Sequence, residues 1–243
     1  MTKPEFALIQ GDARQPALCL LLEDAGYQTQ LLPAPEKWKY ENLPPPGTRL
    51  PVARSTPALQ EAAEEQGFLL MEYGSRPDFK AENGHITAEN ALCLAMLRGN
   101  ILRGAQVLVL GFGAIGSALS HKLLALGSQV WVAARNPQAL EAILRSGCRP
   151  VPLTQVESVL PKADLIFNTI PAIVLPAAHL KQLSSGTQIL DLASHPGGTD
   201  FATAKAMGID AVSALGLPGR MTPNGAAKAI FHTLMQMLRE EQL

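Results

Sequence analysis

The sequence lacks several features that mark particular classes of protein. Its 20 lysines and arginines nearly balance its 21 aspartates and glutamates, and the formal net charge of −1 argues against a surface for nucleic acid or another polyanion. No apolar run approaches the roughly 18 residues that a membrane span requires. The first residues, MTKPEFALIQGD, predict a strand and a turn rather than a basic and apolar leader. We therefore expect a cytoplasmic protein without membrane or nucleic-acid partners.

Cysteine is also scarce. Cys19, Cys93 and Cys148 show neither a CxxC pair nor the spacing of a metal site, so we expect no metal. Cys19 and Cys93 lie within apolar helical patterns, where buried thiols are usual. What the chain does have is 47% hydrophobic residues over 243 positions, enough for one large or two small domains with a substantial core.

Strand and helix patterns alternate through the second half of the chain. Repeated units of this kind predict an α/β fold, a doubly wound parallel sheet of the NAD(P)-binding Rossmann type over residues 104–222. The expected strands are 106–110, 129–134, a short one near 148–152, 164–170, 187–193 and 210–215.

The first half predicts a smaller α/β lobe over residues 1–85. Its proline-rich stretch near 33–57 predicts a loop. Residues 86–103 predict a linking helix with Thr87 as N-cap, and 223–243 predict an amphipathic helix that bridges the two parts. The other expected elements of this lobe are strands at 6–10, 27–32 and 68–73 and helices at about 13–25 and 58–66.

The segment VLVLGFGAIG places Gly111, Gly113 and Gly116 in a G-x-G-x-x-G pattern between a predicted strand and a predicted helix. Gly111 allows the tight turn, Gly113 lets the backbone approach a pyrophosphate, and Gly116 permits close packing of helix on strand. Ala114 and Ile115 open the helix, whose free N–H groups suit phosphates. The motif alone is weak, but its context favours a dinucleotide site over a structural turn.

The end of the next strand indicates which dinucleotide is bound. An NAD site usually has an acidic residue about 20 positions on, to bond the ribose hydroxyls. This chain has Arg135 there and no acid until Glu141. A guanidinium suits a 2′-phosphate, and Asn136 would cap the following helix and leave Arg135 facing the loop. We favour NADP over NAD, with a merely solvated Arg135 as the alternative.

Ligands of an open parallel sheet bind beyond the carboxyl ends of its strands. There the amide of Asn168 and the hydroxyl of Thr169 would bond the nicotinamide ribose or carboxamide, and Pro171 would end the strand. A plain strand-end turn is the alternative. The residues expected to bind the cofactor are Gly111, Gly113, Ala114, Ile115, Gly116, Arg135, Asn136, Asn168, Thr169, Ile170, Pro171, Ala193 and Gly216.

The run DLASHPGGTDF (191–201) ends the next strand, and we expect it to receive an anionic substrate. Gly197 and Gly198 allow a turn whose amides face inward, beside Ser194 and His195. His195 is the candidate proton acceptor because histidine titrates near neutral pH. An exposed turn residue is the alternative for this histidine.

Two arginines are further candidates for binding the substrate. Arg220 lies in the glycine-containing loop after the last strand and could hold a carboxylate bidentately. Arg14 lies in the first turn of a helix that Asp12 would cap. Surface arginines are the alternative for both. Thr199 or Asp200 would cap the helix after the glycine pair.

These segments together resemble the A subunit of dipicolinate synthase, the nucleotide-binding component with which spore-forming bacteria make dipicolinic acid. From about Gly104 the likeness covers essentially the whole chain, and DLAS-PGGTDF is its most specific part. The family's first lobe is usually longer, so we expect a shortened flavodoxin-like lobe here. The segments that carry the resemblance are GDARQ (11–15), VLGFGAIG (109–116), AARN (133–136), NTIP (168–171), DLASHPGGTDF (191–201) and LGLPGRMTPNGAA (215–227).

The resemblance implies oxidation of dihydrodipicolinate to dipicolinate with NADP, in concert with a smaller flavoprotein-like B subunit and in a homo- or hetero-oligomer. The substrate's two carboxylates need donors at opposite ends of its ring. Ser194 with the amides of Gly197 and Gly198 is the candidate at one end, and Arg220 or Arg14 at the other.

Two other functions stay open. A shikimate-dehydrogenase-like reductase shares the two-lobe plan and an Asn after the fourth strand, but would carry a catalytic Lys–Asp pair that none of the first lobe's lysines marks. A non-catalytic NADP-binding protein is the second. The lysines concerned are Lys3, Lys37, Lys39 and Lys80.

Overall fold

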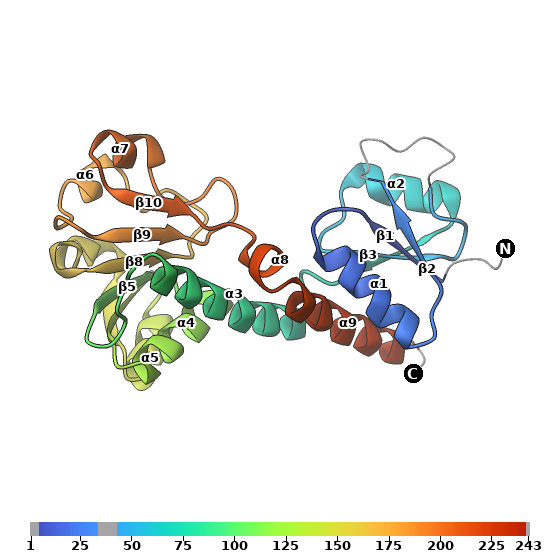
Figure 1. The fold of residues 1–243 in the computed structure, drawn as a ribbon, viewed down its shortest axis with the longest axis horizontal. Coiled ribbons are helices and arrows are strands. Elements are labelled where there is room, and N and C mark those ends of the chain that lie inside the picture. The colour runs from blue at the N-terminus through green and yellow to red at the C-terminus, as the bar shows by residue number, and fades with distance from the viewer. Residues whose placement is uncertain (1–4, 34–42, 242–243) are drawn as a thin grey trace. The chain divides into compact units, whose positions relative to one another are not determined.

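The computed structural model describes residues 5–33 and 43–241, and its contacts divide the chain into two units (Figure 1). The first unit comprises residues up to 86 and from 218 onward, and the second comprises residues 87–217. Each unit has a parallel sheet of its own. Among the described residues, no helix has the length and apolar character that crossing a membrane requires.

The first unit contains a four-stranded parallel sheet in the order β2-β1-β3-β4. This order places β1 between β2 and β3, which is the flavodoxin-like arrangement. The strands are β1 (Phe6–Ile9), β2 (Thr29–Leu32), β3 (Arg49–Val52) and β4 (Leu69–Glu72), and the helices are α1 (Arg14–Asp24), α2 (Pro57–Gln66), the start of α3 (Pro77–Leu97) and α9 (Pro223–Glu240).

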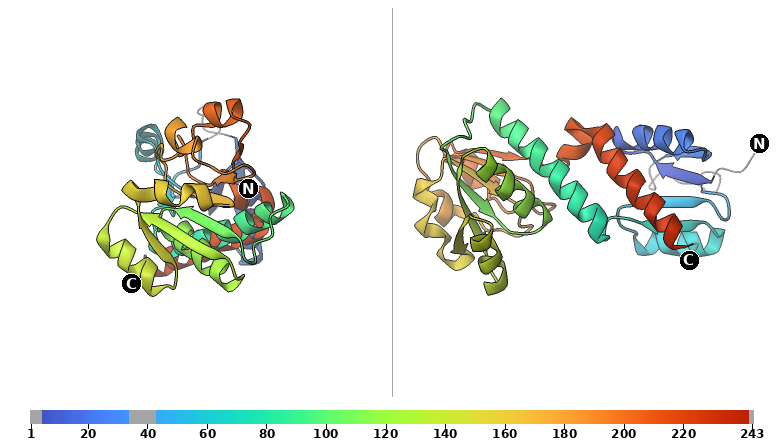
Figure 2. Two further views of the ribbon diagram at one scale, coloured as in Figure 1. Left: turned by 90° about the vertical axis from the view of Figure 1, so that its left-hand side faces the viewer. Right: turned by 90° about the horizontal axis from the view of Figure 1, so that it is seen from below.

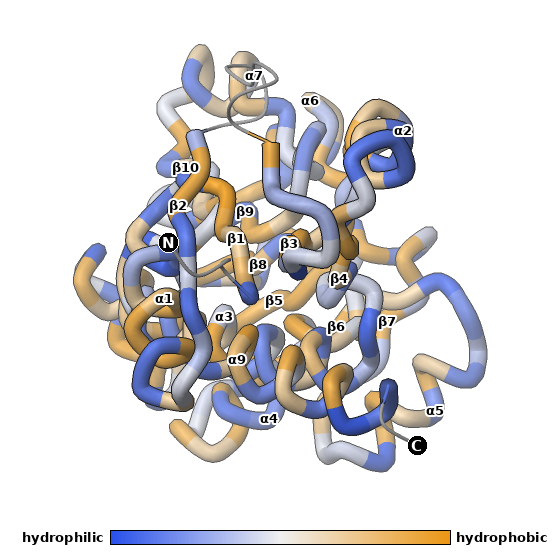
Figure 3. Tube along the Cα trace, turned by 90° about the vertical axis from the view of Figure 1, so that its right-hand side faces the viewer, coloured by the Kyte–Doolittle hydropathy of each residue, from blue (hydrophilic) through white to orange (hydrophobic). Residues whose placement is uncertain are grey.

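Successive side chains of a strand point to opposite faces of the sheet, and here both faces carry apolar side chains that helices cover. Phe6 and Leu8 of β1 pack with Ile230 of α9 in a core that α1 also joins, and α1 and α9 lie side by side (Figures 1 and 2). Ala7, between them, belongs to a second core that includes Leu59 of α2. In α2 apolar residues such as Leu59 and Ala63 are buried and polar residues lie between them, so the helix is coloured with both hydrophobic and hydrophilic residues (Figure 3).

Two sequence predictions for this unit are wrong in part. Residues 49–52 form β3 inside the predicted loop, because pairing with β1 and β4 fixes a strand that its neighbouring prolines concealed. The helix expected from residue 86 begins at Pro77, so Thr87 is not its cap. The buried ring of Phe79 anchors that first turn. Lys3, Lys37 and Lys39 lie outside the described residues.

The second unit confirms the predicted Rossmann fold. Its six parallel strands have the order β10-β9-β8-β5-β6-β7, which reverses between β5 and β8. The strand residues Val107, Leu108, Val109 and Leu110 are fully buried, as expected for a parallel sheet covered on both faces. The elements are β5 (Gln106–Leu110), α4 (Ala114–Ala125), β6 (Gln129–Ala134), α5 (Pro137–Arg145), β7 (Arg149–Pro152), η3 (Leu153–Ser158), η4 (Leu160–Lys162), β8 (Leu165–Asn168), α6 (Ala177–Leu180), β9 (Gln188–Asp191), α7 (Phe201–Ala206) and β10 (Asp210–Ser213).

Candidate functional site

The glycine loop joins β5 to α4 at the point where the strand order reverses. Gly111 has a φ of 99°, in the left-handed region that favours glycine, and a Cβ there would collide with the hydroxyl of Thr169. A Cβ on Gly116 would collide with the carbonyl oxygen of Gly111. These two glycines therefore let strand, loop and helix approach closely.

Gly113 serves a different purpose, because nothing lies within 4 Å of the position that its Cβ would take. No side chain caps α4, and the bond from Ser117 N–H to the carbonyl of Gly113 (2.9 Å) is the first of the helix. The amides of Ala114 and Ile115 precede that bond and have no acceptor within the helix. This loop fits a pyrophosphate, which would fill the space beside Gly113 and accept from those amides.

Arg135 is exposed directly after β6. Asn136 caps α5, as predicted, because its side-chain oxygen accepts from Ala139 N–H at 2.6 Å. No acidic partner of Arg135 is found in the part of the chain that the structure describes. Its guanidinium is therefore available to a phosphate.

Asn168 ends β8 and is completely buried. Its oxygen accepts from Ile170 N–H (3.0 Å), and its nitrogen donates to the Ile170 carbonyl (3.0 Å) and to Oδ1 of Asp191 (2.9 Å). The predicted contact of this amide with the nicotinamide is therefore not supported, because both its donors are used within the protein. The hydroxyl of Thr169 donates back to the carbonyl of Leu110 on β5 (2.8 Å).

Asp191 is a site residue that the sequence did not predict. It ends β9 and is 1% exposed. Its Oδ1 accepts from Asn168 and from Ala193 N–H (3.1 Å), and its Oδ2 accepts from Gly198 N–H (2.9 Å). A buried carboxylate must be hydrogen-bonded, and this one ties the loop after β8 to the loop after β9. A single acid within the apolar run ILDLA was the signal for it.

The glycine pair after β9 uses its amides within the loop. Gly197 N–H donates to the carbonyl of Ser194 (2.8 Å), and Gly198 N–H donates to Asp191. A Cβ on Gly198 would collide with the amide of Asn168. The predicted use of these two amides as donors to a substrate is therefore wrong, because acceptors of the protein already take them.

Ser194 and His195 lie in the same loop and are exposed to solvent. His195 lines a small hollow of about 150 Å³ together with Ala193, Phe201 and Leu215. Asp200, not Thr199, caps α7, and the bonds from the hydroxyl (2.6 Å) and amide (3.0 Å) of Thr203 lower the pKa of this carboxyl. Pro171 is exposed after β8, and Gly216 is exposed after β10 with a φ of 71°.

The first unit holds the two candidate arginines. Asp12 is not the cap of α1, because Ala13 occupies that place with helical angles. Asp12 instead accepts from Nε (2.9 Å) and Nη2 (2.8 Å) of Arg14, which lowers the pKa of the carboxyl and raises that of the guanidinium. Gly219 lies against Asp12, where a Cβ would collide with the carboxylate. Arg220 is exposed, and the segment predicted as a loop around it is a short helix, α8 (Leu217–Met221).

Comparison with known proteins agrees with this geometry. Residues 82–190 match the family described as D-isomer specific 2-hydroxyacid dehydrogenase, NAD binding domain. The A subunit of dipicolinate synthase from Bacillus subtilis (strain 168) is 35% identical over 185 residues, which are 76% of this chain and 62% of that protein. The chain resembles the dipicolinate synthase A subunit.

Solved structures of dipicolinate synthase A chains extend the likeness to the whole fold. The Bacillus subtilis structure has a TM-score of 0.85 at 27% identity and covers 100% of this chain and 98% of that one. The Bacillus halodurans structure has a TM-score of 0.83 at 26% identity and covers 96% and 97%. The resemblance predicted from the sequence is confirmed.

The dipicolinate synthase likeness and the matched domain together support an oxidoreductase with a nicotinamide cofactor. The aligned segment spans 62% of the length of the curated Bacillus subtilis relative. The relative's activity, substrate and partners therefore come to this chain as proposals.

Proposed function

We propose that this chain is the nucleotide-binding component of an enzyme that oxidises dihydrodipicolinate to dipicolinate with NADP during spore formation. The observation that carries the proposal is the 35% identity over 185 residues to the A subunit of Bacillus subtilis dipicolinate synthase. The open glycine loop supports the cofactor half of it, since its amides precede the first bond of α4.

Arg135 selects NADP in this proposal. Its exposed guanidinium follows the strand after the glycine loop, where an NAD-binding domain usually has an acid. It would hold the 2′-phosphate through paired, charge-assisted bonds, while the amides of Ala114 and Ile115 receive the pyrophosphate.

The chemistry needs little from the protein beyond positioning. Bound nicotinamide supplies the hydride acceptor. The substrate ring becomes aromatic when it loses a hydride from one carbon and a proton from a neighbouring atom, so aromatisation drives the step. His195 takes that proton, and its place on the rim of a small hollow leaves its ring accessible.

The substrate's carboxylates are held at opposite ends of its ring. The exposed hydroxyl of Ser194 donates to one carboxylate, without the two glycine amides that the protein itself uses. Arg220, exposed on α8, or Arg14 of the first unit donates to the other, as expected from the sequence. A flavoprotein-like B subunit completes the enzyme as a hetero-oligomer.

Replacement of Arg135 tests the cofactor. Arg135→Ala should weaken NADPH binding about tenfold, measured by calorimetry, and leave NADH binding unchanged. Arg145→Ala is the matched control, because Arg145 is also exposed on the neighbouring α5 and pairs only with Glu141 among the described residues. If the Arg135 variant bound NADPH as tightly as the unaltered chain does, the assignment of Arg135 to the 2′-phosphate would be wrong.

The reaction itself is tested with the purified chain and dihydrodipicolinate formed in the cuvette. Dipicolinate and reduced nicotinamide should appear together, with a candidate B subunit present or absent. Nucleotide binding without hydride transfer in either case would favour a non-catalytic role. Turnover of another substrate, such as a shikimate, would favour a different NADP-dependent reductase. Arg220→Ala should raise the KM for substrate strongly and spare NADP binding.

A further inference from the structure

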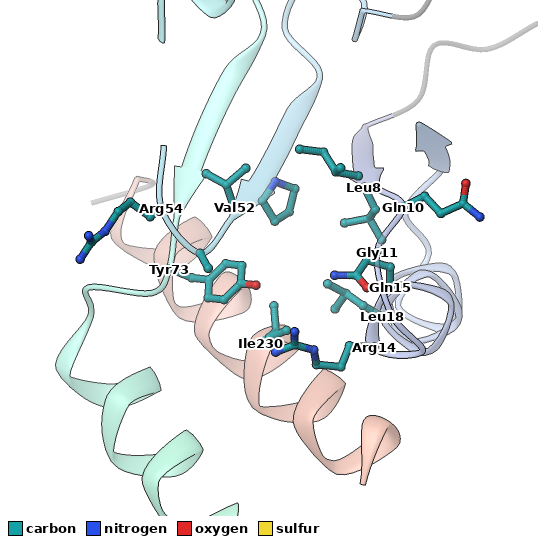
Figure 4. Close-up of a pocket in the computed structure, with 13 residues that line it drawn as sticks. Leu8, Gln10, Gly11, Arg14, Gln15, Leu18, Val52, Arg54, Tyr73 and Ile230 are labelled. Carbon is teal, nitrogen blue, oxygen red and sulfur yellow. The ribbon is translucent and has the colours of Figure 1, made fainter. Parts of the chain in front are cut away.

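The first unit has a pocket of its own at the carboxyl ends of its strands. It measures about 420 Å³ and is lined by residues that end β1 and β3, together with residues of α1 and α9 (Figure 4). The flavodoxin-like strand order reverses between β1 and β3. In open α/β sheets this reversal is the place where ligands bind.

The walls of the pocket are apolar. They are formed by Leu8 of β1, Leu18 of α1, Val52 of β3 and Ile230 of α9, all of them buried, with the ring of Pro51 beside them. Such walls suit the face of a flat ring, and the volume exceeds what a single six-membered ring with its substituents needs.

Tyr73 is the first of the polar groups that converge on this space. It follows β4 and is 7% exposed, and its hydroxyl points into the pocket (Figure 4). No hydrogen bond of this hydroxyl is found within residues 5–33 and 43–241. Burial raises the pKa of Tyr73, so the phenol stays a proton donor. Buried tyrosine hydroxyls usually have a partner, which a ligand would supply here.

Gln15 lies on the opposite wall, in the first turn of α1 (Figure 4). Its side-chain oxygen is buried and has no hydrogen-bond partner among the residues described. This oxygen is an acceptor and cannot bond a carboxylate, whereas the side-chain nitrogen of the same amide points into the pocket and can donate to a ligand (Figure 4).

Arg14 completes the polar side. Asp12 holds its Nε and Nη2, which fixes the guanidinium, and Nη1 has no partner among the residues that the structure describes and can donate to a ligand. Asp12 offsets the charge of this guanidinium, so the pocket does not suit a cluster of anionic groups, and a single carboxylate would be held by hydrogen bonds from the donors that line it. Arg54 also lines the rim, but its side chain points away from the cavity (Figure 4).

We propose that this pocket binds one carboxylate and the adjoining ring face of a flat aromatic or dihydroaromatic acid. Tyr73 Oη, Nε2 of Gln15 and Nη1 of Arg14 donate to the carboxylate, and the apolar walls hold the ring. The assignment of that acid as the pyridine dicarboxylate of the enzyme rests on the proposed function. Tyr73 and Gln15 are then binding residues in addition to the arginine expected from the sequence.

The test is calorimetry on the full chain without nucleotide, with dipicolinate and, separately, benzoate as probes. Tyr73→Phe and Gln15→Leu should each weaken the binding of both probes about fivefold or more, because each variant loses a hydrogen bond to the carboxylate. Tyr27→Phe is the matched control, since Tyr27 packs edge-on against Phe6 in the same unit and does not line the pocket. Denaturant unfolding should show that all three variants are folded.

The outcomes separate the pocket from the reaction. If dipicolinate binds the Tyr73→Phe variant as tightly as the unaltered chain, the proposal that this pocket binds the carboxylate is wrong. The proposal is also wrong if neither probe binds the unaltered chain. Benzoate that binds in a Tyr73-dependent manner while dipicolinate does not would support the carboxylate pocket and overturn dipicolinate as its acid. Hydride transfer, assayed separately, then decides the proposed function.

Discussion

The second unit contains two glycine-containing loops that are alike in sequence but differ in whether their backbone N–H groups bond acceptors of the protein itself. Both follow a buried parallel strand and lead toward a helix, one at residues 111–116 and the other at 194–198. In the first, the amides at the start of α4 have no side-chain acceptor, and the space beside Gly113 is open. In the second, the amides of Gly197 and Gly198 donate to Ser194 and Asp191.

Asp191 is the cause of this difference. Its buried carboxylate lies beneath the second loop and needs donors, whereas the first loop has no such acceptor among its described contacts. Glycine therefore shows where the chain can turn tightly, and the acceptors nearby decide which way the amides point. A glycine-rich loop is an anion site only where its N–H groups are left unpaired.

The largest effect should come from Gly198→Ala. The new methyl would collide with the amide of Asn168 and the carbonyl of Ile170, so the variant should lose about 3 kcal/mol of unfolding free energy. Denaturant unfolding measures this loss. An unchanged transition midpoint would show that the second loop is not packed as tightly as its contacts imply.

Asp191→Asn should have the next largest effect. The charge-assisted bonds to two amides and to Asn168 are weakened or broken, at a cost of about 2 kcal/mol in unfolding free energy. Asp200→Asn is the control, since asparagine also caps helices well. If both variants unfold at the same denaturant concentration as the unaltered chain, Asp191 does not organise the loop.

Gly113→Ala should separate binding from stability. No atom stands within 4 Å of the added methyl, so the unfolding midpoint should not change. The methyl would occupy the space of the pyrophosphate, and the affinity for NADPH should fall about tenfold, or about 1.4 kcal/mol, by calorimetry. Retained affinity would place the phosphates elsewhere and remove the contrast between the two loops.

The smallest effect should be the pH dependence of two carboxylates that share one arginine, the partly buried Asp78 and the exposed Glu240, which contrast with the fully buried Asp191. Arg76 donates to Asp78 (3.0 Å) and Glu240 (2.7 Å) and holds the pKa of both carboxyls below the ordinary value. Their contribution to stability is complete above the unfolded pKa of about 4 and is lost as pH falls through the lower folded values.

Arg76→Gln should therefore flatten the acid limb of unfolding free energy against pH in the first unit. The change should be slight, because half of the Glu240 side chain is exposed to solvent, which screens the pair. An acid limb as steep as that of the unaltered chain would show that other carboxyls set it.

The sequence by itself determined the features that depend on neighbours along the chain. Alternating apolar runs specified the six-stranded sheet, Asn136 before a proline specified the start of α5, and Gly111 to Gly116 specified the turn into α4. Each of these rests on contacts within a few residues, so a local pattern is enough.

Only the tertiary structure decided how the polar groups are used. Asn168 and Asp191 are 23 positions apart and find each other only when β8 and β9 pair, and that bond takes away the amide expected to face the nicotinamide. Tyr73 and Gln15 share a cavity only because β4 and α1 belong to one sheet unit. β3 likewise exists because β1 and β4 lie beside it. The choice of a hydrogen-bond partner depends on distance in space, which the order of residues does not state.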